Sequence, residues 1–124
     1  MREYDPLHPP DPTEWLTLDE DERIQLVRDY HEREGVKLPS LQAHAAVQAI
    51  VETQVAMGSE LPVASTLTRL QSEGLDRHDA IHAIGSVLVA QFHGIALGGV
   101  AVDPNPAYAA ALERLNAKSW RHAR

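Results

Sequence analysis

The chain has 124 residues, a formal net charge of −7 and no cysteine. The lack of cysteine excludes disulfides and thiolate metal sites and favours a cytoplasmic location, and no apolar run reaches the roughly 18 residues of a membrane-spanning helix. Residues 1–34 hold 11 acidic and 4 basic side chains, and because such a segment repels phosphate groups and has no apolar anchor, we expect no nucleic-acid and no membrane partner.

The N-terminal part is expected to begin with an arm and continue as a helix. Four prolines in residues 1–13 predict an extended, Pro-rich arm, because proline lacks the backbone N–H that a helix interior needs. The first helix is expected from about residue 19 to residue 34, with Thr17 or Asp19 as its N-cap. Gly35 follows its last turn, which is the usual place for a glycine that ends a helix.

Turn residues divide the rest of the chain into four further helices. Their expected limits are Ser40 to about residue 57, Pro62 to Gly74, Asp76 to about residue 97, and Asn105 to about residue 119. We therefore predict an all-α protein, a four-helix bundle built of two helical hairpins plus a short C-terminal helix. The predicted division is 1–13 as the arm, 14–98 as the helical bundle domain, and 99–124 as the linker and C-terminal helix.

Two of the expected helices carry the same residue pattern 34 positions apart. In each, a histidine is followed one helical turn later by a second polar side chain: His44 and Gln48 in the first, His78 and His82 in the second. The pattern predicts an internal duplication of a helical hairpin, and shared architecture without duplication is the alternative. Gly85 in the second helix would permit the two helices to approach closely.

The repeated pattern predicts a metal site between the two helices. Residues i and i+4 share one face, so His78 and His82 can bind one ion, and His44 can reach it from the facing helix. Gln48 or a water would complete the shell. Glu52 and Asp79 are candidates to orient these ligands from behind, and Glu52 could instead belong to a second metal. The expected cofactor is a divalent metal, with zinc first and iron, manganese or nickel as other fits.

The chain also resembles a small bacterial family of helical proteins of unknown function. The matching positions, over roughly residues 14–90, are Trp15-Leu16-x-Leu18-Asp19-Glu20, Tyr30-His31, His44, Val51-Glu52-x-Gln54 and Gly74-Leu75-x-Arg77-His78-x-Ala80-x-His82-Ala83-Ile84. The resemblance implies a His-x-x-x-His pair on both helices, and Gln48 stands here where the second histidine of the first pair is expected. With glutamine at this position, the resemblance implies a weakened metal site or one with an open coordination position. The resemblance implies no particular activity.

The alternative function is a non-enzymatic protein-interaction module whose histidines form a hydrogen-bonded core. Trp15 and Trp120 could then contact a protein partner or a second copy in a homo-oligomer, or simply cover the core of the domain. His31, near the end of the first helix, is expected to be a surface residue, because positive charge is favourable there. The sequence does not decide whether the protein is an enzyme; metal-assisted hydrolysis is the first reaction class to test.

Overall fold

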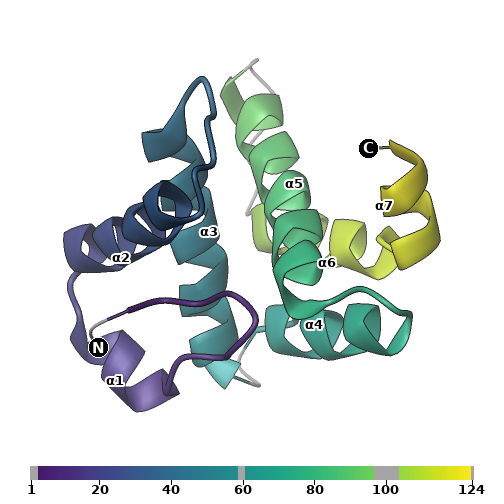
Figure 1. Cartoon of the computed structure of the whole chain (residues 1–124). Helices are drawn as coiled ribbons and strands as arrows, with labels where there is room; N and C mark the ends of the chain where they lie inside the picture. The colour runs from purple at the N-terminus through teal and green to yellow at the C-terminus, as the bar shows by residue number, and fades with distance from the viewer. Residues whose placement is uncertain (1–2, 59–60, 97–103, 124) are drawn as a thin grey trace.

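The computed structural model describes residues 3–58, 61–96 and 104–123, and within these ranges it is all-helical, without strands (Figure 1). The predicted all-α class is therefore confirmed. The seven helices of these ranges are α1 (Pro12–Thr17), α2 (Glu20–Arg33), α3 (Leu41–Ala56), α4 (Val63–Ser72), α5 (Arg77–Ala96), α6 (Pro104–Arg114) and α7 (Ala117–Ala123). The predicted limits of α2, α3 and α4 and the predicted start of α5 agree with these limits to within about two residues. The predicted end of α5 at about residue 97 and the start of the predicted linker at residue 99 lie outside the described residues.

Local capping explains where α1 and α2 begin. Asp11 accepts a hydrogen bond from the backbone N–H of Glu14 at 3.0 Å, and Pro12 occupies the first turn of α1, where its missing N–H costs nothing. Asp19 and Glu22 form a complete capping box at the start of α2, which confirms Asp19 as the N-cap. The prediction of an extended arm over residues 1–13 is wrong for its last two residues, because Pro12 is the first residue of α1.

The helices pack as two neighbouring pairs joined through α3 and α5 (Figure 1). α2 packs against α3, α4 packs against α5, and α3 packs against both α4 and α5. Gly85 lies at the α3–α5 contact: a Cβ there would be 3.2 Å from the side chain of Val47, so the glycine permits this close approach as expected. α6 also packs on α4 and α5, so helices beyond the four of the predicted bundle contribute to the packing. The specific arrangement as a four-helix bundle of two hairpins stays a prediction.

The C-terminal region is two helices and not the single helix predicted for residues 105–119. α6 ends at Arg114 and α7 begins at Ala117. Asn116 stands between them as the N-cap of α7, because its side-chain oxygen accepts a hydrogen bond from the backbone N–H of Ser119 at 2.8 Å. Its cap satisfies one of the N–H groups that the start of a helix leaves unpaired.

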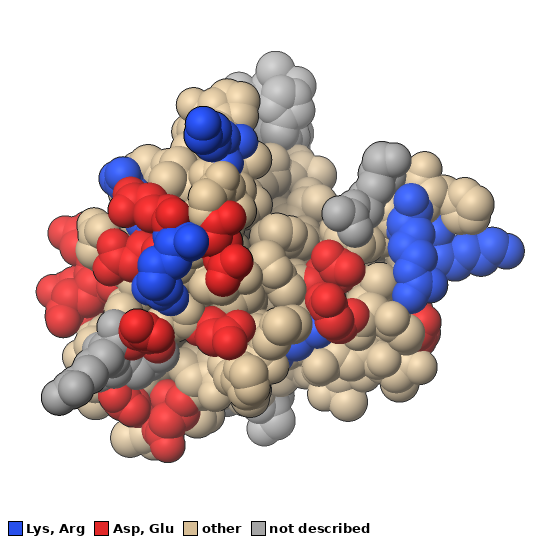
Figure 2. Space-filling view, in the orientation of Figure 1, with Lys and Arg blue, Asp and Glu red and all other residues tan. Residues whose placement is uncertain are grey.

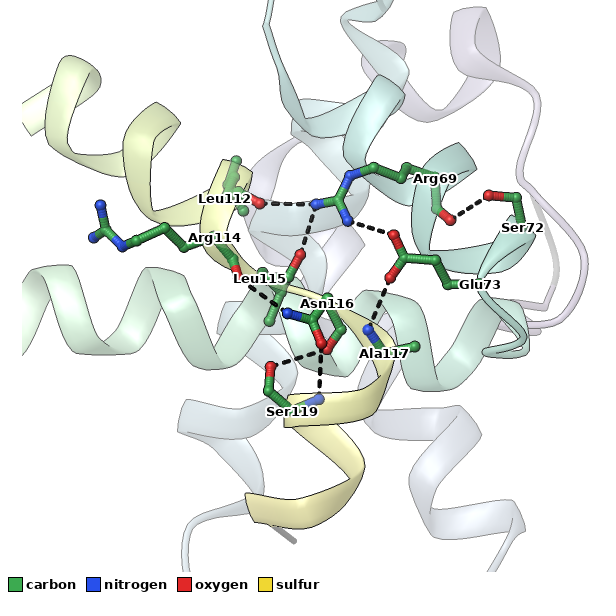
Figure 3. Close-up of polar contacts among 9 residues, drawn as sticks. All are labelled: Arg69, Ser72, Glu73, Leu112, Arg114, Leu115, Asn116, Ala117 and Ser119. Carbon is green, nitrogen blue, oxygen red and sulfur yellow. Dashed lines mark hydrogen bonds and ion pairs between the residues drawn. The ribbon is translucent and has the colours of Figure 1, made fainter.

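Two side chains fix the break between α6 and α7: Arg69 on α4 and Glu73 at the C-terminal end of α4 (Figure 3). Arg69 donates hydrogen bonds to the carbonyl oxygens of Leu112 and Leu115 at 2.9 and 2.7 Å, at the end of α6. Glu73 accepts one from the backbone N–H of Ala117 at 2.9 Å, at the start of α7, and pairs with Arg69 at 2.7 Å. A cation therefore meets the negative end of one helix dipole and an anion meets the positive end of the next.

Charge is unevenly distributed over the molecular surface. In Figure 2 acidic side chains gather over α1 and α2, whereas Lys and Arg side chains dominate the side that α7 forms. This arrangement agrees with the acidic composition of residues 1–34. Among the described residues, no helix is both long and apolar enough to cross a lipid bilayer.

Candidate metal centre

Four histidines from three helices lie next to one another where α2, α3 and α5 meet. One ring nitrogen from each of His31, His78 and His82 lies within 4.8 Å of the others. The ring of His44 lies beside this triad, with its centroid 4.8 Å from that of His31 and 4.9 Å from that of His82. Two of the predicted ligands, His78 and His82, are thus brought together, the third lies adjacent, and a fourth histidine joins them.

His31 is fully buried, so its prediction as a surface residue is wrong: 1% of it is exposed. Its Nδ1 lies 2.8 Å from the carbonyl oxygen of Val27, one turn earlier in α2. Because a carbonyl only accepts, Nδ1 carries a proton, and in the neutral ring Nε2 then carries a lone pair. That Nε2 is buried and has no hydrogen-bond partner among the described residues. The spacing of one helical turn from the apolar Val27 is the sequence signal that would have placed His31 on the buried face.

His78 and His82 are one turn apart on α5, as their spacing predicted. Their Nε2 atoms are 3.1 Å apart. Ligand nitrogens around a tetrahedral zinc, each about 2.0–2.1 Å from the ion, are about 3.3 Å apart. The two nitrogens therefore already have nearly the separation that a shared ion requires. Tyr30 packs edge-on against His78 and His31, with ring centroids 5.7 and 5.4 Å away, and restrains both rings.

The environment of His44 and His78 favours the neutral imidazole, the form that binds metals. Burial, followed by the charges of His31 and His78, lowers the pKa of His44. Burial, followed by the charge of His31, also lowers the pKa of His78, although Asp76 and Asp79 act in the opposite direction. The Nε2 of His44 is buried and, like that of His31, lacks a partner in the described part of the chain.

Gln48 is buried on α3 and has its amide oriented by Tyr4. The hydroxyl of Tyr4 donates its only hydrogen to Glu52, so it can only accept from Gln48, whose Nε2 lies 3.1 Å away. The amide atom of Gln48 that does not contact Tyr4 is therefore its carbonyl oxygen. This oxygen is buried and unpaired within the described residues. Burial, followed by the charge of Glu52, raises the pKa of Tyr4 well above its usual range.

Glu52 is held in a buried ion pair that the sequence did not indicate. Its two carboxylate oxygens accept hydrogen bonds from Arg77 at 2.7 Å each, and one of them also accepts from Tyr4. Arg77 donates in addition to the carbonyl oxygen of Pro6 at 3.0 Å. Glu52 therefore ties the N-terminal arm to α3 and α5, and its expected part behind the metal ligands stays a prediction.

Asp79, the other residue expected behind the metal ligands, lies in the first turn of α5. Its backbone N–H donates to the side chain of Asp76 at 2.8 Å, which confirms Asp76 as the cap of this helix. Its negative charge acts on His78 in the direction that favours imidazolium. Its expected part in a metal shell stays a prediction.

Comparison with known proteins adds no further guide to the site. Neither the family models nor the curated proteins nor the solved structures contain a match to this chain. The resemblance to a bacterial family with paired His-x-x-x-His helices stays a prediction, and the function is inferred from the geometry of the histidine cluster.

Proposed function

We propose that this protein binds one divalent transition metal, zinc first, through His31, His78 and His82. The observation that carries the proposal is the convergence of one nitrogen from each ring within 4.8 Å. Imidazole nitrogen is a preferred ligand of zinc, and the chain has no cysteine to compete for the ion. Iron, manganese and nickel also accept imidazole ligands and are tested beside zinc.

The hydrogen-bonding inventory supports a cation over a purely hydrogen-bonded core. The Nε2 lone pair of His31 has no donor among the described residues, and its proton position is fixed by Val27 on the other side of the ring. A hydrogen bond from a metal-binding histidine to a backbone carbonyl is the usual way in which such a ring is oriented. Leaving a buried acceptor unpaired costs about 1–3 kcal/mol, and a bound ion removes that cost.

His44 determines whether the proposed site has three or four imidazole ligands. Its ring contacts His31 and His82, and its Nε2 lacks a partner in the described part of the chain. Four histidines would close a tetrahedral site, as in structural zinc centres, whereas three would leave a position for water or a ligand. The affinity of the His44→Gln variant separates these cases, because only a fourth ligand makes its loss as large as that of His78→Gln.

The two-hairpin arrangement and the predicted relationship belong to the same proposal. We propose that α2–α3 and α4–α5 act as two helical hairpins of one bundle that bring the repeated histidine positions together. The contacts of α2 with α3, α4 with α5 and α3 with α5 support this arrangement. The paired-histidine bacterial family that the sequence resembles would then share the same site.

Zinc titration of metal-free protein, produced without a histidine tag, tests the proposal. We expect one equivalent to bind, and His78→Gln to weaken binding by at least about tenfold, or about 1.4 kcal/mol. His78 is half-buried, so the substitution should preserve the helix content measured by circular dichroism. His122→Gln on the exposed side of α7 is the matched control and should bind as the wild type does. Equal affinity in both variants would contradict the proposal.

The alternative is an interaction module with a hydrogen-bonded histidine core. The 3.1 Å contact between His78 and His82 favours it, because one neutral imidazole can donate to another at that distance. It leaves the buried Nε2 atoms of His31 and His44 without a partner among the described residues, which is why it ranks second. Failure of zinc and the other three metals to bind, with a concentration-dependent mass in sedimentation, would establish this alternative.

A further inference from the structure

A pocket of about 390 Å³ lies between α3, α5 and α7, next to the histidine cluster. This volume is within the range of pockets that bind small organic molecules. His44 and Gln48 from α3 and His82 and Ser86 from α5 form its polar wall. The pocket is thus lined on two sides by the i, i+4 pairs of neighbouring helices.

The polar wall offers acceptors for hydrogen bonds. The amide nitrogen of Gln48 donates a hydrogen bond to Tyr4, so the unpaired polar atom of this pocket residue is its carbonyl oxygen. Ser86 donates its hydroxyl hydrogen to the carbonyl oxygen of Ala83 at 2.6 Å, which leaves its oxygen lone pairs to accept. A molecule with an N–H or O–H group would satisfy these atoms.

The remaining lining is apolar. Val47, Val89 and the ring of Trp120 form it, and Gly85 leaves the α5 wall without a side chain at its position. The eight lining residues include no Asp, Glu, Lys or Arg to neutralise a charged ligand. Burying an unpaired charge beside such walls is costly, whereas an apolar ring or chain gains from leaving water.

We propose that this pocket binds an uncharged organic molecule that combines an apolar body with an N–H donor directed at Gln48. This inference goes beyond metal binding, because it depends on the carbonyl of Gln48, the hydroxyl oxygen of Ser86 and the apolar walls, none of which is a proposed metal ligand. The Tyr4–Glu52–Arg77 chain acts as the device that holds the amide of Gln48 in this orientation. The pocket and the ion are therefore separable by experiment.

Ligand-observed NMR with metal-free protein tests the donor and the charge. Benzamide has an apolar ring and an N–H donor, N,N-dimethylbenzamide lacks the donor, and benzoate carries a charge. We expect saturable binding of benzamide and binding at least about fivefold weaker for N,N-dimethylbenzamide, as the loss of one hydrogen bond predicts. Benzoate should also bind at least about fivefold more weakly, because its charge would be buried without a partner. No saturable binding of benzamide, or equal binding of all three compounds, would overturn the inference.

Two tryptophan substitutions on α5 test the location. Val89 lines the pocket and is 47% exposed, so Val89→Trp should fill the space without disturbing the core. Ala90, the next residue, is exposed and outside the pocket lining, so Ala90→Trp is the matched control. Benzamide binding should be lost in the first variant and kept in the second; retention in both would place the ligand elsewhere and overturn the inference.

Zinc titration of the Val89→Trp variant separates this inference from the proposed function. We expect unchanged zinc affinity together with lost benzamide binding, because Val89 is not among the proposed ligands. If no variant and no wild-type sample binds a metal while benzamide binding follows the expected pattern, the pocket stands and the metal proposal falls. Zinc binding without any benzamide binding would overturn the pocket and leave the metal proposal standing.

Discussion

Replacing Glu52 with glutamine should be among the most destabilising single changes in this protein. Glu52 and Arg77 are 1% and 6% exposed, and two hydrogen bonds of 2.7 Å join them. Without the carboxylate, Arg77 keeps its charge in the interior with no counterion, which costs about 3–5 kcal/mol. A domain of ordinary stability has only about 5–15 kcal/mol in total, so the loss is a large fraction of it.

The charge on Arg77 cannot simply be given up to avoid this cost. In the wild type, burial lowers the pKa of Arg77, but Glu52 and Tyr4 raise it, and the net direction is upward. Glu52→Gln removes the contribution of the carboxylate, but a guanidinium loses its proton only far above neutral pH, so Arg77 stays charged in the variant. Removing both charges should therefore cost less than removing one. We expect the double variant Glu52→Gln, Arg77→Met to be more stable than Glu52→Gln alone, although the donor to Pro6 is also lost.

Urea unfolding followed by circular dichroism measures these differences. Glu113→Gln on the exposed side of α6 is the matched control and should change the free energy of unfolding by less than about 0.5 kcal/mol. A loss below about 1 kcal/mol in Glu52→Gln, or a double variant less stable than the single one, would refute the buried ion pair as described.

Three further predictions concern the helix ends and the metal. Asp19→Ala should lower the free energy of unfolding by about 1 kcal/mol in urea denaturation, because it removes the capping box of α2. Hydrogen bonds from Ala117 and then Arg69 lower the pKa of Glu73 from 4.5, so its contribution to stability is present above that pH and lost as the pH falls through the lowered value. The difference in urea midpoint between wild type and Glu73→Gln should therefore be seen at about pH 6 and shrink as the pH falls below 4.5; a difference independent of pH would contradict this. Chelator treatment of the zinc-loaded protein should lower its melting temperature, and an unchanged value at saturating zinc would count against a bound ion.

Local signals in the sequence predicted much of the fold. Asp19 caps α2 because its carboxylate reaches an N–H only three residues away, and such short-range chemistry can be identified without a structure. The break between α6 and α7 was not predicted, because Arg69 and Glu73 reach it from more than 40 positions away. The spacing of His78 and His82 likewise placed them together, since one helix carries both.

The parts of the site that were missed depend on packing between distant segments. His31 looked like a surface residue near a helix end, but the approach of α3 and α5 to α2 buries it. Arg77 likewise showed no sign of burial in the sequence, because its partner Glu52 lies 25 positions away on another helix. The orientation of Gln48 also depends on a distant segment, because Tyr4 of the arm accepts a hydrogen bond from its amide nitrogen; its expected place at the ion stays a prediction.

The X-ray absorption spectrum of the zinc-loaded, tag-free protein tests the central claim most directly. Convergence of His31, His78 and His82 on one ion predicts at least three imidazole nitrogens at about 2.0–2.1 Å from zinc. A spectrum with fewer than three imidazole ligands, or one left unchanged by His78→Gln, would contradict the account.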